Sequence, residues 1–160
     1  MRNEIIPNIG NYKNLLTYKK AVIIYDITYY FCKNYLEKKD RTVDQMIQAA
    51  RSGKQNIVEG CASGTISLKS KIFLINVAKA SFQELLEDYK DYLMIHGYKK
   101  WEDNSIEKQK MRAIASNPDN DNFITVIAKS RSPDVIANMM IVLLYQEDYL
   151  LYKLLQVLDE

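Results

Sequence analysis

Carboxylates are the side chains of this sequence that are best spaced for chemistry. Four of them lie within a stretch of eight residues: Glu84, Glu87, Asp88 and Asp91. A di-iron bundle site would require Glu-x-x-His pairs on two helices, whereas this chain has a single histidine, His96, and two cysteines. That histidine lies beside an expected helix end, where an imidazole interacts favourably with the helix dipole. We therefore expect neither a metal ion nor a cofactor, and a carboxylate metalloenzyme is the third-ranked interpretation.

Glu59 and Glu84 form a second candidate pair, because two carboxylates can share general acid and base roles. Nothing near them in the sequence supplies a nucleophile, a phosphate-binding loop or a metal ligand set. The favoured interpretation is structural: in a seam between subunits the acids would satisfy Arg51 and backbone groups, since a buried charge needs partners. We expect no catalytic residue. We do expect a contact between Arg51 and Glu59 and a structural polar seam that consists of Arg51, Asn56, Glu59, Ser81 and Glu84.

Basic residues gather in one part of the chain. The formal net charge is only +2, which does not by itself indicate a nucleic-acid-binding protein. Residues 38–79 nevertheless hold eight basic and three acidic side chains, whereas residues 80–160 hold nine basic and fourteen acidic ones. Ordinary solvated helix surface is the competing explanation. The candidate nucleic-acid contacts are Lys38, Lys39, Arg41, Lys54, Lys69 and Lys71.

The composition bounds the elements that must position these side chains. At 160 residues, with 48% hydrophobic and 26% charged residues, the chain fits one globular domain. Only 5 Gly and 3 Pro argue against a sandwich or barrel with many tight turns. No apolar run reaches the ~18 residues of a membrane span, and the N-terminus does not resemble a signal peptide. We therefore expect no membrane association. Because Cys32 and Cys61 show no disulfide spacing, we also expect a cytoplasmic protein.

Apolar residues recur at helical spacing in four long segments. These are residues 15–37, 43–61, 67–95 and 132 to near the C-terminus. Thr42 with Gln45 matches a capping box. Ser132-Pro133-Asp134 matches an N-cap followed by a proline at the first helical position, and Gly97 fits the residue that follows a helix. The expected fold is all-α: a single domain over residues 1–160 that forms an antiparallel up-down four-helix bundle.

The connection between helices three and four, residues 98–131, shows a weaker pattern, and we expect it to be elaborated but irregular. Asn104 to Glu107 resembles a capping box for a short helix through about Ala115. Residues 117–122 form a turn cluster of Asn and Asp, and residues 123–128 predict a short helix or an extended packing segment. Residues 1–13 are expected to be an N-terminal extension.

The first and third segments each carry two apolar faces. In the first, the stripe Leu15, Tyr18, Val22, Tyr25, Tyr29 and Leu36 is taken as the principal face, with Ile24, Ile27 and Phe31 roughly opposite. In the third, a principal stripe that includes Ile75 and Phe82 is opposed by Phe73, Val77 and Ala80. A monomeric bundle needs one broad stripe on each helix, so the surplus predicts a homo-oligomer.

Residues 18–98 carry a family resemblance. Tyr25-Asp-Ile-Thr, Gln45 to Gly53 (QMIQAARSG), Asn56-Ile-Val-Glu-Gly60, and Phe73-Leu74 followed by Ala78 to Leu85 occur in order. Together they resemble the four-helix-bundle proteins encoded in ribosomal RNA intervening sequences. Relatives of that family include the accessory variability determinant proteins of diversity-generating retroelements and the four helix bundle suffix domains. Val58 stands where the family usually has a small residue, and residues 98–131 depart from it altogether.

The resemblance implies an antiparallel bundle that assembles into a ring-like homopentamer with no established enzymatic activity. In the retroelement relatives a basic outer surface contacts nucleic acid and a reverse transcriptase. The leading interpretation is accordingly a non-enzymatic oligomeric module that contacts RNA or DNA through basic residues of its first half. The alternative is a protein-binding adaptor that has no affinity for nucleic acid.

Overall fold

The computed structural model describes residues 15–62 and 66–159, and within those ranges the chain is all-helical. The expected N-terminal extension, residues 1–13, lies outside them. The described part contains six α-helices and one 3-10 turn and no strand. The elements are α2 (Leu16–Tyr35), α3 (Arg41–Ala62), α4 (Leu68–Ile95), α5 (Ile106–Ala115), η2 (Pro118–Asn120), α6 (Asp121–Ala128) and α7 (Pro133–Asp159).

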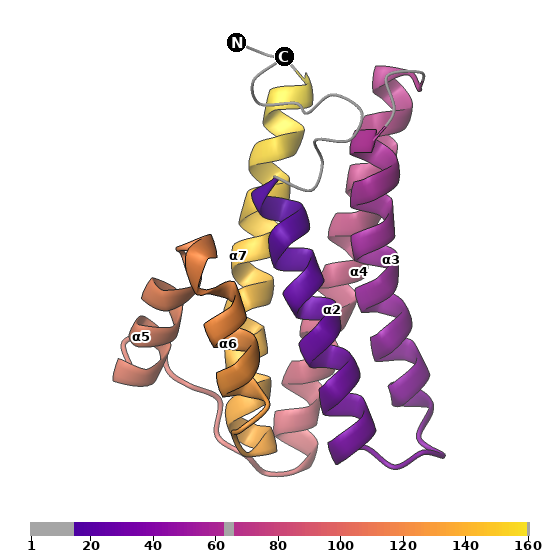
Figure 1. The fold of residues 1–160 in the computed structure, drawn as a ribbon. Coiled ribbons are helices and arrows are strands. Elements are labelled where there is room, and N and C mark those ends of the chain that lie inside the picture. Colours follow the sequence, from indigo (N-terminus) through magenta and orange to yellow (C-terminus); the bar gives the residue numbers. More distant parts are fainter. Residues whose placement is uncertain (1–14, 63–65, 160) are drawn as a thin grey trace.

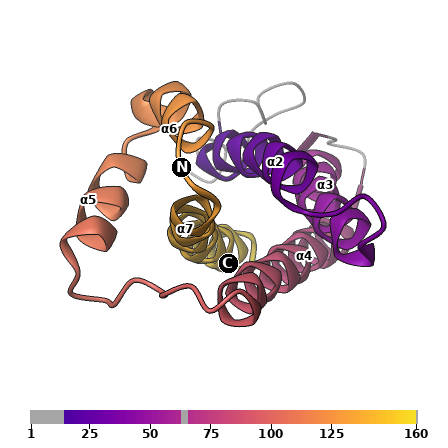
Figure 2. The same cartoon turned by 90° about the horizontal axis from the view of Figure 1, so that it is seen from below.

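The four long helices, α2, α3, α4 and α7, stand side by side as a bundle (Figures 1 and 2). Each contacts the next along the chain, and α7 closes against α2. All four contribute to one core, which includes the fully buried Phe31, Ile57, Phe82 and Leu143. None of the helices in the described ranges is both long and apolar enough to cross a bilayer.

The ends of the helices follow local chemistry. Asp40 caps α3, because its Oδ1 accepts a hydrogen bond of 2.9 Å from the Thr42 N–H. The cap therefore lies two residues before the expected one, and Thr42 lies inside the helix. Ser67 Oγ accepts from the Ser70 N–H at the start of α4. Gly97 has a φ of 69°, which a residue without a Cβ adopts at little cost after a helix.

The connection between α4 and α7 is more regular than the expected irregular segment. Ser105 caps α5 by accepting from the Lys108 N–H. The Asn-Asp cluster then forms only the short turn η2, after which α6 begins at Asp121. An Asx side chain can close a turn and leave the chain free to resume a helix. The second option for residues 123–128, an extended segment, is therefore wrong.

Asn138, a buried residue of α7, anchors the start of this connection. Its Oδ1 accepts from the Trp101 N–H at 2.8 Å, and its Nδ2 donates to the Lys99 carbonyl at 3.0 Å and to the Asp134 carbonyl at 3.0 Å. One side chain thereby satisfies backbone groups of a segment that has no helical partners of its own.

The two apolar faces of α2 have the opposite ranking from the one expected. Ile24, Ile27 and Phe31 are fully buried, whereas Val22 is 37% and Tyr29 47% exposed. Spacing identifies two faces but does not say which one meets the core, and a tyrosine tolerates a half-exposed position because its tip is polar. On α4 the principal face is buried from Ile75 to Leu93, and the opposite face leaves Phe73 66% exposed.

Helix α6 covers part of the apolar surface that the sequence analysis assigned to subunit contacts. It packs on α2 and buries Ile124 and Ala128. Just beyond it, the Lys129 carbonyl accepts from Tyr30 Oη at 2.8 Å, and Lys129 Nζ pairs with Asp26 at 2.8 Å. The surplus on α2 is therefore smaller than the sequence suggests, because the connection supplies a neighbour from within the same chain.

Candidate functional site

The six basic candidates lie in three separate places. Lys38, Lys39 and Arg41 are exposed at the turn between α2 and α3, at the foot of the bundle in Figure 1. Lys69 and Lys71 lie in the first turn of α4, at the opposite end. Lys54 lies midway along α3, with its ammonium 4.5 Å from the centroid of the Tyr25 ring. As expected, the two end clusters do not meet within one chain.

The polar seam divides into an ordered part and an exposed part. Ser52 Oγ and Ser81 Oγ form a 3.0 Å hydrogen bond between α3 and α4. Asn56 Nδ2 donates to the Ser52 carbonyl at 2.8 Å and to Ser52 Oγ at 3.2 Å. Two of the five expected members, Asn56 and Ser81, are thus brought together through Ser52, which the sequence analysis did not include.

The charged members of the seam, Arg51, Glu59 and Glu84, are exposed. Among the ion pairs of the described residues none joins Arg51 to Glu59. All three side chains are open to solvent in the single chain. Their burial in a seam would require a second chain.

The acidic residues of α4 crowd one another. Glu84, Glu87 and Asp91 are exposed and Asp88 is half-buried. Burial, followed by the negative charges of Asp91, Glu84 and Glu87, raises the pKa of Asp88 to about 6. The ring of His96 lies over Tyr92, 4.1 Å between centroids, and its Nδ1 is 3.0 Å from the Tyr92 carbonyl oxygen. Within the described ranges no three His, Cys, Asp or Glu residues are grouped to hold a metal ion.

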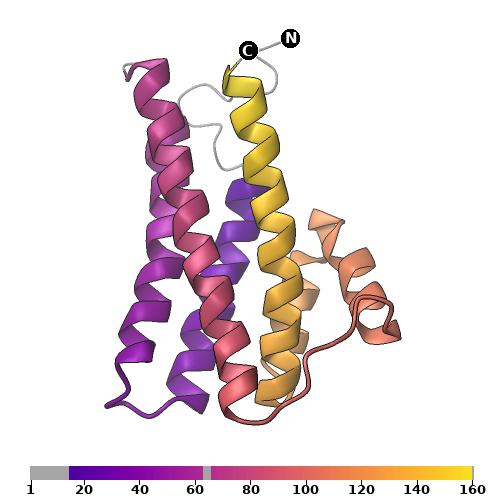
Figure 3. The ribbon, with the colours of Figure 1, turned by 180° about the vertical axis from the view of Figure 1, so that it is seen from behind.

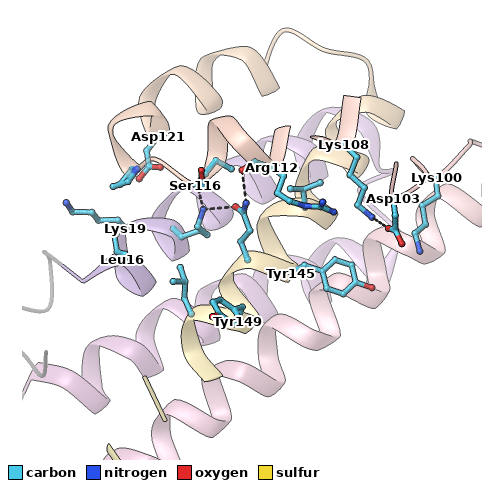
Figure 4. Close-up of a pocket in the computed structure, with 16 residues that line it drawn as sticks. Leu16, Lys19, Lys100, Asp103, Lys108, Arg112, Ser116, Asp121, Tyr145 and Tyr149 are labelled. Atoms are coloured by element: carbon cyan, nitrogen blue, oxygen red, sulfur yellow. Dashed lines mark hydrogen bonds and ion pairs between the residues drawn. The ribbon is translucent and has the colours of Figure 1, made fainter. Parts of the chain in front are cut away.

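Helix α5 stands away from the bundle (Figure 3). A cavity of about 910 Å³ lies on this side of the bundle (Figure 4). Its floor is one face of α7, which carries Val142, Tyr145, Tyr149 and Leu150. The other walls come from α2, the connection and α5. Its titratable side chains other than tyrosine are Lys19, Lys20, Lys100, Lys108, Arg112, Asp103 and Asp121, so five cations face two carboxylates.

Polar contacts join the last turn of α5 to α2 and α7 beside this cavity. Lys20, a buried residue of α2, donates from Nζ to the Ala115 carbonyl at 2.8 Å and to Gln146 Oε1 at 3.0 Å. Gln146 Nε2 donates in turn to the Arg112 carbonyl at 3.0 Å (Figure 4). The last carbonyls of a helix have no partner within it, and a cation there also meets the negative end of the helix dipole. Lys20 therefore attaches α5 to the bundle.

Beneath Lys20 lies a buried carboxyl. Glu147 on α7 is fully buried, and neither of its oxygens has a hydrogen-bond partner among the described residues. Burial raises the pKa of Glu147 well above its usual range; the charge of Lys20 opposes this and that of Asp121 adds to it. Burial likewise lowers the pKa of Lys20, against the attraction of Glu147 and Asp121. The pKa of Asp121 is also raised, because burial outweighs the nearby Lys20 and Lys19.

Comparison with known proteins found no match. No family model, curated protein or solved structure matches this chain. The candidate sites therefore rest on the residues themselves.

The cavity and its charges were not predicted from the sequence. Residues 80–160 have an excess of acidic residues, so their summed charge does not indicate the local group of cations Lys100, Lys108 and Arg112. The spacing of Lys108 and Arg112, one helical turn apart on a predicted short helix, was the local sign available. No pattern along the chain indicated that α2 would bring Lys19 and Lys20 to the same place.

Proposed function

We propose that this chain is an up-down four-helix bundle that self-associates and acts as a non-enzymatic binding module. The observation that carries the proposal is apolar surface left open on two long helices. On α4, Leu68 is 50% and Phe73 66% exposed, and on α2 Val22 and Tyr29 are more than one third exposed. Exposed apolar surface of this kind is typical of protein contact sites, and both helices lie within residues 18–98, the part of the chain that resembles the intervening-sequence proteins.

A ring of five copies would place the open face of α4 against a neighbouring subunit and repeat the basic clusters around each end. Lys38, Lys39 and Arg41 would form one collar, and Lys69 and Lys71 the other. We propose nucleic acid as the partner of these collars, because clustered cations release counterions when they bind phosphates. The buried free thiols of Cys32 and Cys61 support a reducing cytoplasm as the compartment.

Self-association is tested by light scattering over a dilution series with Phe73→Ser and, as its matched control, Phe123→Ser. Phe123 is 54% exposed on α6, in the connection that the family resemblance does not cover. Burying a phenylalanine contributes about 2 kcal/mol, so Phe73→Ser should raise the dissociation constant roughly 30-fold, whereas Phe123→Ser should leave it unchanged. A monomeric natural chain at micromolar concentration would refute the proposal.

Nucleic-acid binding is tested by a gel-shift titration over salt. A triple variant of Lys38, Lys39 and Arg41 to Gln should weaken binding and flatten its salt dependence, because fewer phosphates are neutralised. The matched control removes the same charge from exposed lysines of the second half, Lys99, Lys110 and Lys153, and should change binding little. An oligomer that binds no nucleic acid at low salt would instead favour the alternative function, a protein-binding adaptor.

A further inference from the structure

We infer that the cavity between α5 and α7 is a binding site for a small organic anion that carries a planar apolar body. This ligand site is distinct from the proposed subunit and nucleic-acid contacts. It lies in the connection and on α7, outside the segments on which the family resemblance rests.

The anion would bind at the end of the cavity where three cations share one carboxylate. Lys108 Nζ pairs with Asp103 Oδ1 at 2.6 Å. Lys108, Arg112 and Lys100 together lower the pKa of Asp103, the hydrogen bond from Lys108 being the largest cause. Figure 4 shows these four side chains gathered at the same end of the cavity. A single carboxylate leaves two positive charges in excess, and Arg112 has no ion-pair partner within the described part of the chain.

The ring of the ligand would lie on the floor formed by α7. Tyr145 and Tyr149 line the cavity, whose base also contains Val142 and Leu150. Their side chains are 44% and 58% exposed, so the rings are accessible to a ligand. Aromatic faces next to apolar side chains bind planar rings by stacking and burial. A volume of about 910 Å³ lies within the range of small-molecule sites, which are mostly apolar with a few placed polar groups.

The structure already fixes the walls of this site. The buried Lys20 and its partner Gln146 hold the last turn of α5, and the buried Asn138 holds the connection that precedes α5. A ligand would therefore meet a largely preformed cavity and would not have to order it, which reduces the entropic cost of binding.

The test uses two fluorescent probes with the same rings, 8-anilinonaphthalene-1-sulfonate and the uncharged N-phenyl-1-naphthylamine, titrated against the full chain. Arg112→Gln should weaken binding of the sulfonate roughly tenfold, as loss of a charge-assisted hydrogen bond predicts, and should change binding of the neutral probe less than twofold. Asp103→Asn should strengthen sulfonate binding, because it removes the competing carboxylate. The side chain of Asp103 is 93% exposed, so the substitution does not open the core.

Lys110→Gln is the matched control, since Lys110 is an exposed cation of α5 that does not line the cavity. It should leave both probes unaffected, and melting curves should show that every variant is folded. The inference is overturned if Arg112→Gln and Lys110→Gln weaken sulfonate binding equally, because the effect would then be general surface charge. It is also overturned if the two probes respond alike to Arg112→Gln, which would indicate an unspecific apolar surface.

Discussion

Gly53 on α3 lies so close to α4 that its replacement by alanine should destabilise the protein, although alanine favours a helix. A Cβ added at Gly53 would lie 2.4 Å from Phe82 Cζ and 2.6 Å from both Cε atoms. The ring would have to move by about 1 Å to reach van der Waals contact, and Phe82 is only 1% exposed, so it cannot turn out to solvent.

The magnitude follows from two opposing effects. Overpacking a core costs about 1–3 kcal/mol, whereas replacing a helical glycine by alanine contributes about 1 kcal/mol of stability. Gly53→Ala should thus lower the free energy of unfolding by up to about 2 kcal/mol. In a domain of this size that corresponds to a fall in Tm of up to roughly 8 °C.

Urea denaturation followed by circular dichroism in two backgrounds tests this reasoning. Phe82→Leu removes the three ring atoms that the new methyl group would meet. In that background Gly53→Ala should be neutral or stabilising by up to ~1 kcal/mol, because only the helix propensity remains. Gly60→Ala is the control on the same helix: its Cβ would meet the flexible tip of Ile75 at 3.0 Å, so its effect should be smaller. An equal loss in both backgrounds, or stabilisation of the natural chain, would refute the close approach of α3 and α4.

Three further substitutions test buried polar groups. Glu147→Gln should stabilise the protein by a margin that grows as pH rises above about 4.5, the ordinary pKa of a glutamate. Above that pH the unfolded carboxyl loses its proton, whereas burial raises the pKa of the folded carboxyl so that it stays protonated. Rising pH therefore favours the unfolded state of the natural chain but not that of the variant. Asp88→Asn should likewise gain stability relative to the natural chain between pH 3.8 and about 6, since the folded pKa of Asp88 is raised to about 6. Asn138→Ala should cost about 1–3 kcal/mol, because it leaves the Trp101 N–H and two carbonyls without their partner.

Melting curves across pH check the first two substitutions. A constant difference between Glu147→Gln and the natural chain at all pH values would mean that Glu147 is charged when folded. Urea denaturation checks Asn138→Ala, and an unchanged midpoint would show that the connection is held by other contacts.

The sequence predicted the helices well because their starts and ends depend on local chemistry. Pro133 and Gly97 mark boundaries that the structure reproduces, and the predicted short helix after Asn104 is α5. The ranking of the two faces of α2 could not be predicted, since it depends on which neighbours pack against Ile24 and on α6, which lies about a hundred residues further along the chain.

The candidate sites were less predictable, because they too depend on contacts between segments that are far apart in the sequence. Lys38, Lys39 and Arg41 lie at the end opposite Lys69 and Lys71, as expected, because that placement follows from the order of the helices alone. The cavity results from side chains of α2, α5 and α7 that meet only in the folded chain, and Lys20 becomes a cap for α5 only there. The burial of Glu147 also depends on these contacts, because the sequence of α7 alone does not reveal whether Glu147 faces solvent or the core.

The position of α5 and α6 restricts how copies of this protein can be arranged. Because α6 covers one flank of α2 and α5 projects beside α7 (Figure 2), the chain itself already covers that side of the bundle. In the proposed ring, the open face of α4 would therefore make the repeated contacts, and the α5–α6 projection would lie at the periphery. Each subunit would then keep its own cavity open to solvent, and the number of such cavities would equal the number of chains.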